Sequence, residues 1–194
     1  LTKRIVVSKT ATLFDPLNFI APFTIRAKIG IQKAWVKGLE WDEILPSQLT
    51  KYWELWFTKL AQLNIIHIPR CIMPADKEIK HTSLHTFVDS SELAYAAVSY
   101  LRCEYEDDSV CTTIVAAKTR VAPLKALSIP KLELSSAILG LRLCERICEV
   151  LQIPSNDVTY WSDSQNVLYW IRGESRKYKP FVAHRIGEIH EKSQ

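Results

Sequence analysis

The sequence has 194 residues, of which 47% are hydrophobic, and its formal net charge is +4 at pH 7. This length allows one or two domains, and the apolar content can fill a core, which excludes a disordered or low-complexity chain. Because no apolar run is long enough to span a bilayer and no signal peptide opens the chain, we expect an intracellular, cytoplasmic protein without a membrane partner.

Residues 1–80 are predicted to be a mostly helical segment. The run Thr2–Ser8 suggests a strand, a helix is expected from Pro22 to about Lys37, and Ile65–Ile68 suggests another short strand. A second helix is expected from Ser47, because large apolar residues recur there at helical spacing: Leu49, Trp53, Trp56, Leu60 and Leu63. The segment carries 12 Lys and Arg against 7 Asp and Glu, which is weak evidence for a nucleic-acid partner.

Residues 81–194 have a different pattern, and we expect a domain boundary near residue 80. Three strands joined by short loops predict an antiparallel meander, and a long helix announced by Ser128 and Pro130 follows. The expected strands are Leu84–Asp89, Ala94–Tyr100, Val110–Ala117 and Val158–Trp161, and the later helices are Gln165–Arg172, capped by Ser164, and Val182–Lys192. This order predicts an α/β fold with helices packed on a mixed sheet.

The five cysteines, an odd number without CxxC spacing, do not predict a disulfide framework. Cys144 and Cys148 would lie one helical turn apart, but a zinc site there would need histidines nearby, and the sequence offers none. We therefore interpret the cysteines, which include Cys71, Cys103 and Cys111, as reduced and buried thiols in a reducing compartment.

Three acidic residues stand where a sheet-based domain builds a site. Asp89 and Asp163 end predicted strands, and Glu133 is expected in the first turn of the long helix. Converging carboxylates repel each other unless cations lie between them, and oxygen ligands suit Mg²⁺ or Mn²⁺. Two such ions about 3.5–4 Å apart can drive phosphodiester hydrolysis. Taken singly, each acid is more often a cap or a surface charge, and Glu133 alone is better explained by the helix dipole.

Several motifs resemble known proteins. Phe87–Ser91 with Ala94–Val98 resembles the first hairpin of ribonuclease H, Ile129–Leu134 resembles the helix that carries its glutamate, and Trp161–Ser164 resembles the strand that carries its second aspartate. Nearly the whole chain resembles the Pao/Bel class of LTR retrotransposon polyproteins, a family also known as Pao retrotransposon peptidases. The further matching motifs are Thr2–Arg4, Phe14–Leu17, Ala21–Pro22, Lys28, Gln32, Trp35, Trp41–Asp42, Ala117–Leu124 and Phe181–Arg185. Since no Asp-Thr/Ser-Gly triplet is present, we do not carry over protease activity.

The resemblance implies an RNase H-like mixed sheet of three antiparallel strands and one parallel strand, preceded by a helical segment that connects it to a reverse transcriptase. It implies that Asp89, Glu133 and Asp163 hold two Mg²⁺ or Mn²⁺ ions that cut the RNA strand of an RNA–DNA hybrid. The implied partners are the hybrid, or another nucleic acid, and the rest of the retroelement polyprotein. A virus-like particle or the nucleus is then an alternative location.

Two departures from the family pattern affect these expectations. The chain begins with Leu1 and ends at Gln194, so we expect a fragment that lacks the last strand and a fourth metal-site aspartate, and whose activity alone is in doubt. Asn18 stands where the family has glycine, but asparagine tolerates the left-handed backbone and should preserve the turn. The alternatives are a non-catalytic nucleic-acid-binding or scaffold fragment of a decayed element, and an unrelated α/β protein with chance motifs.

Two basic clusters are candidates for contact with a nucleic-acid backbone. One is Lys118, Arg120 and Lys125; the other is Arg172, Arg176, Lys177, Tyr178, Lys179 and Arg185. An ordinary solvated loop and helix explain the second cluster equally well. The run Tyr105–Asp108 spells a polymerase Tyr-x-Asp-Asp motif, but we interpret it as a hairpin turn between two strands.

Overall fold

The structure, a computed structural model, describes residues 1–73 and 77–193. The chain divides into two compact units, each with a hydrophobic core of its own. The first unit comprises residues 1–16 and 20–70, and the second comprises residues 17–19 and 71–194. The assignment of residues 1–80 and 81–194 as functional domains stays a prediction. Within the described residues, none of the helices combines the length and apolar character that a membrane span requires.

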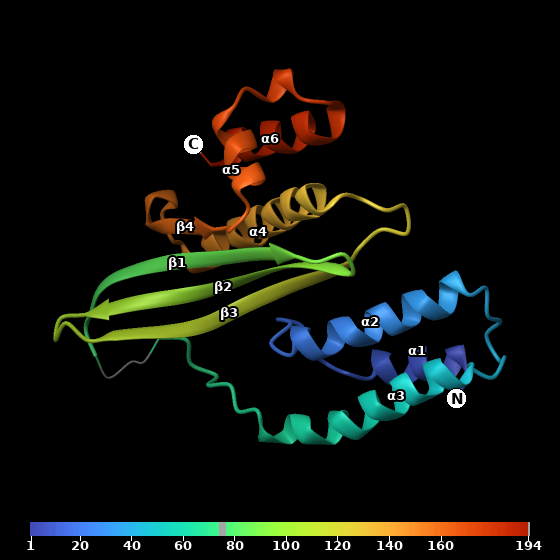
Figure 1. The fold of residues 1–194 in the computed structure, drawn as a ribbon. Coiled ribbons are helices and arrows are strands. Elements are labelled where there is room, and N and C mark those ends of the chain that lie inside the picture. Colours follow the sequence, from blue (N-terminus) through green and yellow to red (C-terminus); the bar gives the residue numbers. More distant parts are fainter. Residues whose placement is uncertain (74–76, 194) are drawn as a thin grey trace. The chain divides into compact units, whose positions relative to one another are not determined.

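The first unit is helical, as predicted (Figure 1). Its elements are α1 (Lys3–Ala11), α2 (Ala21–Val36), α3 (Ser47–Leu60) and the short 3₁₀ helix η1 (Ala61–Ile65). The apolar stripe predicted for the helix from Ser47 faces the core, where Trp53 and Trp56 are fully buried. Their neighbours there include Val6, Ala27, Ala34 and Leu49. The aromatic residues therefore form a hydrophobic core here.

Both short strands predicted in this unit are wrong. Thr2–Ser8 begins helix α1, because the Thr2 side chain caps the helix and the buried Val6 packs among the other helices. An extended backbone needs hydrogen bonds to a neighbouring strand. Among the described residues, Thr2 forms only an isolated bridge, to Ile44. Ile65 ends η1 and Ile66–Ile68 forms no strand. β-Branched residues were a weak guide where no partner strand lies alongside.

The family-like motifs of the first unit hold its helices and loops together. The Lys3 ammonium group is buried, donates to the Leu39 carbonyl oxygen and lies 3.9 Å from the centre of the Trp35 ring. Arg4 forms two parallel hydrogen bonds to Asp42, with Nε–Oδ1 and Nη2–Oδ2 distances of 2.7 and 2.9 Å. These motif residues therefore stabilise the first unit by holding α1 to the loop that follows α2.

The second unit contains a four-stranded mixed sheet in the order β3-β2-β1-β4. Strands β1 (Ile79–Ser90), β2 (Ala94–Tyr105) and β3 (Val110–Val121) form the predicted antiparallel meander, and β4 (Val158–Trp161) pairs parallel to β1. The helices are α4 (Ile129–Leu151), α5 (Gln165–Arg172) and α6 (Pro180–Lys192), with 3₁₀ turns η2 (Ser155–Asp157) and η3 (Ser175–Lys177). The expected three antiparallel strands and one parallel strand are therefore confirmed.

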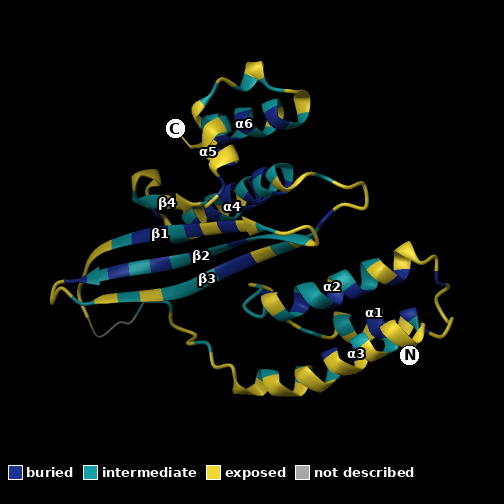
Figure 2. Cartoon of the chain, viewed as in Figure 1, coloured by how far each residue is buried: buried dark blue, intermediate teal, exposed yellow. Residues whose placement is uncertain are grey.

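Helix α4 consists largely of buried and half-buried residues (Figure 2). Toward the sheet, its Leu139 packs with Val88 of β1 and Ala97 of β2. Away from the sheet, Leu134 and Ile138 pack with residues of α5 and α6, namely Val167, Val182, Ile186 and Ile189. Helix α4 is therefore the middle layer between the sheet and the pair α5 and α6 (Figure 1).

The turn at Asn18 is preserved, as expected. Asn18 has a φ of 55°, in the left-handed region where glycine and asparagine are the least strained residues. The preceding carbonyl oxygen, that of Leu17, accepts a hydrogen bond of 2.9 Å from the backbone N–H of Ala117. Asparagine thus replaces glycine without loss of this backbone conformation.

Candidate active site and basic groove

Two of the predicted acids lie at the same edge of the sheet. In the parallel pairing of β1 with β4, the last partners are Phe87 and Trp161. Asp89 and Asp163 each follow two residues later, so both stand at the carboxyl ends of neighbouring parallel strands. Both residues are exposed to solvent. The pairing of the two strands thus brings together acids that are 74 positions apart in the chain.

Glu133 is held beside this edge by a serine. Ser164, the residue after Asp163, donates a hydrogen bond of 2.5 Å from its hydroxyl to Oε2 of Glu133. The same hydroxyl accepts a bond of 3.2 Å from the backbone N–H of Val167 and so caps α5. Ser164 is buried, and Glu133 is half-buried. One side chain therefore connects α4 to the loop that carries Asp163.

The position expected for Glu133 within its helix needs correction. Helix α4 begins at Ile129, and its first turn contains no acidic residue. Glu133 is the fifth residue of the helix and lies in the second turn, where the N-terminal dipole acts more weakly. The helix dipole therefore explains this glutamate less well than its bond to Ser164 does.

The three carboxylates have no cationic partner in the part of the chain that the structure describes. None of the ion pairs there includes Asp89, Glu133 or Asp163. Asp89 accepts only a local bond of 2.6 Å from the backbone N–H of Ser90, whose buried hydroxyl has no hydrogen-bond partner among the described residues. The edge thus offers oxygen atoms whose charge the protein leaves uncompensated.

The carboxylate oxygens of these three acids are of the type that binds a hard divalent cation, but they do not surround a metal position. Within residues 1–73 and 77–193, no group of three or more His, Cys, Asp or Glu side chains is arranged to hold a metal ion. Mg²⁺ is usually bound by one or two carboxylates, with water and substrate phosphates as the other ligands. Asp89, Glu133 and Asp163 therefore suit a partial ligand set that a substrate would complete.

Some of the predicted basic residues come together in a groove of about 520 Å³ in the second unit. Lys118 and Arg120 reach it from β3, and Arg185 reaches it from α6. Lys125 and the stretch Arg172, Arg176, Lys177, Tyr178 and Lys179 are not part of its lining. The sequence had grouped Arg185 with that stretch, whereas the fold brings it to Lys118 and Arg120.

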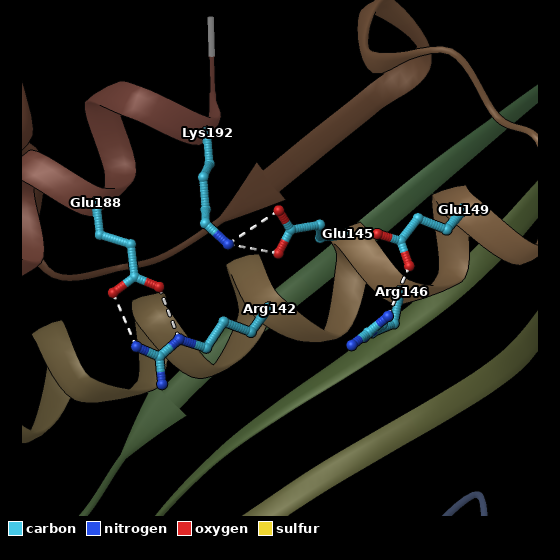
Figure 3. A network of polar contacts seen from close by, with 6 residues as sticks. All are labelled: Arg142, Glu145, Arg146, Glu149, Glu188 and Lys192. Carbon is cyan, nitrogen blue, oxygen red and sulfur yellow. Dashed lines mark hydrogen bonds and ion pairs between the residues drawn. The ribbon is translucent and has the colours of Figure 1, made fainter.

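Sequence reasoning missed Arg142 and Arg146 of α4, which also line the groove. Their spacing of four residues places them on one face of the helix, and this is the signal that could have identified them. Arg142 forms two hydrogen bonds of 2.7 and 2.8 Å to Glu188 of α6 (Figure 3). This guanidinium holds the pKa of Glu188 below its ordinary value.

Tyr105–Asp108 forms the hairpin turn between β2 and β3, as predicted. Asp108 has a φ of 59°, and Asp107 accepts hydrogen bonds from Lys77 and from both the hydroxyl and the backbone N–H of Ser109. These bonds, that of Lys77 first, hold the pKa of Asp107 below its ordinary value. Asp107 and Asp108 thus stabilise the hairpin turn, and a polymerase site is not needed to explain the run Tyr105–Asp108.

The mixed sheet, with three antiparallel strands and one parallel strand, is the sheet expected of an RNase H-like domain. A family model described as the Pao retrotransposon-like RNaseH-like domain matches residues 2–164, and the chain belongs to this family. A comparison with curated proteins gives no match. One solved structure, described as "Structure of the foamy viral protease-reverse transcriptase dRH in complex with ds DNA", matches with a TM-score of 0.40 and 14% identity. The match covers 96% of this chain and 33% of that one.

Proposed function

We propose that this chain is the RNase H-like part of a Pao-type retroelement polymerase and that it supports metal-dependent hydrolysis of the RNA strand of RNA–DNA hybrids. Residues 1–80 are then the segment that connects it to the reverse transcriptase, and the remainder of the polyprotein is its partner. The observation that supports the reaction most is the position of Asp89 and Asp163 at the ends of two paired parallel strands, with Glu133 bonded to Ser164 beside them.

In this proposal Asp89, Glu133 and Asp163 hold divalent cations, Mg²⁺ or Mn²⁺, two in the full site. When bound, such ions activate a water molecule and stabilise the leaving oxygen of the phosphodiester. The protein contributes position: Ser164 orients the Glu133 carboxylate, and the solvent-exposed Asp89 and Asp163 stand where a substrate phosphate can share their cations. Recognition of the hybrid then depends on backbone shape and 2′-hydroxyl groups, because the cut has to tolerate any sequence.

The test is cleavage of an RNA–DNA hybrid by a polyprotein segment extended beyond Gln194, so that a fourth acid is included. Asp89→Asn and Asp163→Asn should each abolish Mg²⁺-dependent cleavage, because each removes a charged oxygen ligand. The matched control is Asp108→Asn in the β2–β3 turn, where the same change should leave cleavage intact because asparagine also tolerates its φ of 59°. Normal cleavage by either Asp89→Asn or Asp163→Asn would refute the assigned site.

A second candidate function, a nucleic-acid-binding scaffold without catalysis, is favoured by one observation. The described residues contain no group of three metal-ligating side chains in place for an ion. Titrating Mg²⁺ while following the carboxylate NMR signals of the chain separates the two functions. The catalytic proposal expects the signals of Asp89, Glu133 and Asp163 to shift together at millimolar Mg²⁺. If the chain is a scaffold without catalysis, these carboxylate signals should show no selective shift, and the chain should still bind the hybrid.

A further inference from the structure

A cluster of aromatic side chains lies on the face of the sheet opposite α4. Val88 of β1 packs against α4. Since side chains alternate along a strand, His85, Phe87 and Asp89 point to the opposite face. Trp161 of β4 is the strand partner of Phe87, so its side chain lies on this same face. The aromatic residues at the ends of β1 and β4 therefore share a face with Asp89.

Trp161 is held by two rings of the neighbouring strand. Its ring stacks on that of Phe87, with centroids 5.7 Å apart and an interplanar angle of 9°. The His85 ring also lies beside it, with centroids 6.1 Å apart, and the indole Nε1–H donates a hydrogen bond of 3.2 Å to Nδ1 of His85. Trp161 is the last residue of β4 and precedes Asp163 by two positions. These contacts therefore fasten to β1 the strand end from which Asp163 follows.

The bond from Trp161 fixes the protonation state of His85. An indole N–H can only donate, so Nδ1 of His85 has to be an unprotonated acceptor. A neutral imidazole then carries its proton on Nε2, which lies 3.1 Å from the hydroxyl oxygen of Ser83 and donates to it. A doubly protonated ring has no acceptor left for the indole. The observed arrangement therefore requires neutral His85 in this one tautomer.

The surroundings of His85 favour the neutral ring. The residue is half-buried, and burial, followed by repulsion from Arg102 of β2, lowers its pKa from the ordinary value of 6.5. Arg102 is itself paired with Glu104, and farther along β1 the His81 ring is paired with Asp157 of η2. No residue of β4 is charged at neutral pH. The neutral form of His85 is therefore the one expected at neutral pH.

We propose that neutral His85 is a positioning residue for the acidic edge: through Trp161 it holds the end of β4, and with it Asp163, in place beside β1. Its importance for cleavage rests on the proposed function, whereas the hydrogen bond and the tautomer rest on the geometry alone. Because the bond exists only while the imidazole is neutral, it is complete above pH 6.5 and is lost as the pH falls through the lowered pKa of His85.

The first experiment follows His85 by NMR in the chain of residues 1–194. Long-range ¹H–¹⁵N spectra between about pH 8 and about pH 5 report which imidazole nitrogen is protonated. We expect the proton on Nε2 at the upper end and a titration midpoint below 6.5. The indole N–H signal of Trp161 and the amide signals of Ser162 and Asp163 should move with the same midpoint. Protonation of Nδ1 at about pH 8, or an indole signal that does not follow the imidazole, would overturn the proposal.

Two variants separate the hydrogen bond from the packing of the ring. His85→Asn keeps an acceptor, because its amide oxygen can replace Nδ1, and it does not ionise, whereas His85→Phe keeps a ring without an acceptor. The indole signal of Trp161 should stay independent of pH in both variants, near its neutral-pH position in His85→Asn and displaced from it in His85→Phe. The β4 amides should exchange faster in His85→Phe. Phenylalanine is the better strand residue, so a merely structural role predicts the opposite order.

A matched control is His184→Asn, which replaces an exposed histidine of α6. This variant should leave the Trp161 signal and its dependence on pH unchanged. If it alters them as much as His85→Phe does, or if His85→Asn and His85→Phe are indistinguishable, His85 does not act through the hydrogen bond and the proposal is wrong. An unchanged urea midpoint of the control verifies its fold.

The second experiment measures cleavage of an RNA–DNA hybrid by the segment extended beyond Gln194. At saturating Mg²⁺ and about pH 8, His85→Phe should cleave roughly 2- to 10-fold more slowly than the wild type, as the loss of one hydrogen bond predicts, and His85→Asn should cleave nearly normally. Toward about pH 5, the rate of His85→Asn relative to the wild type should rise, because only the wild type loses the bond.

The two proposals can fail separately. Normal cleavage by His85→Phe would refute the positioning role of His85 and leave the nuclease intact. If the wild-type segment does not cleave the hybrid, the proposed function fails, whereas the NMR titration still decides whether His85 holds the end of β4.

Discussion

Replacing Gly140 with alanine tests the contact that positions α4 against the sheet. A Cβ atom at Gly140 would collide with Cγ1 of Val88 in β1 and would lie 3.3 Å from Cγ2 of Thr86. Both neighbours are β-branched strand residues with stiff χ1 angles, so they cannot turn away cheaply. Val88 immediately precedes Asp89, so a shift here is expected to reach the candidate site.

The magnitude follows from two opposing contributions. Alanine stabilises a helix interior by about 0.5–1 kcal/mol relative to glycine. Overpacking a core costs about 1–3 kcal/mol, because the helix or the strand has to move. Gly187 of α6 is the matched control, since a Cβ there meets no atom within 4 Å. Gly187→Ala should therefore gain about 0.5–1 kcal/mol, and Gly140→Ala should be about 1–3 kcal/mol less stable than that variant.

The assay is hydrogen exchange of the β1 amides in urea, which follows the second unit selectively because the two units need not unfold together. In Gly140→Ala the exchange of β1 should become faster than in Gly187→Ala at each urea concentration. Equal stabilisation by both substitutions would mean that α4 does not approach β1 as closely as described, and the reasoning about the position of Glu133 would fail with it.

Two further predictions concern the buried Ser164 beside α4 and the half-buried Cys148 within it. Ser164→Ala should cost about 1–2 kcal/mol, since it removes the cap on Val167 and the bond to Glu133, whereas Ser164→Thr should keep most of that stability; equal urea midpoints for the two variants would contradict this. Burial and the neighbouring Cys144 raise the pKa of Cys148 to about 12, so the folded state favours its neutral thiol. Stability should therefore be constant well below pH 9.0, the ordinary pKa of the thiol, and decrease from there toward pH 12 as the thiol of the unfolded chain ionises. Urea midpoints at neutral and alkaline pH in reductant measure this, and Cys148→Ala should lose part of the decrease; an identical decrease in that variant would exclude the thiol.

The sequence predicted local structure best where several signals agreed. Ser164 before Gln165 predicted the start of α5 correctly, because capping is a property of a few adjacent residues. The extended run at Thr2–Ser8 misled because strand formation needs a partner, and the first unit supplies helices instead. The interpretation of all five cysteines as buried was wrong for three of them, because Cys71 is exposed and Cys111 and Cys148 are half-buried.

The candidate site was foreseeable in its residue types but not in its connections. Acids at strand ends suggested Asp89 and Asp163, whereas the hydrogen bond from Ser164 to Glu133 depends on how α4 crosses the sheet. The groove was foreseeable only in part, because Lys118 and Arg185 are far apart in the chain and become neighbours when α6 packs on α4. Charge patterns along a sequence show which residues are basic, not which of them share a surface.

The amino-acid sequence alone determined the order of the elements in the second unit, the family and the identity of the three acids, since hydrophobic periodicity, turn residues and motifs are local properties. Only the tertiary structure decided that β4 pairs with β1 in a register whose last partners, Phe87 and Trp161, each stand two residues before an acid, and that α4 is buried on both sides. The physical reason is that strand register and helix packing are chosen by burial of side chains from distant segments, and this choice exists only once the chain is folded.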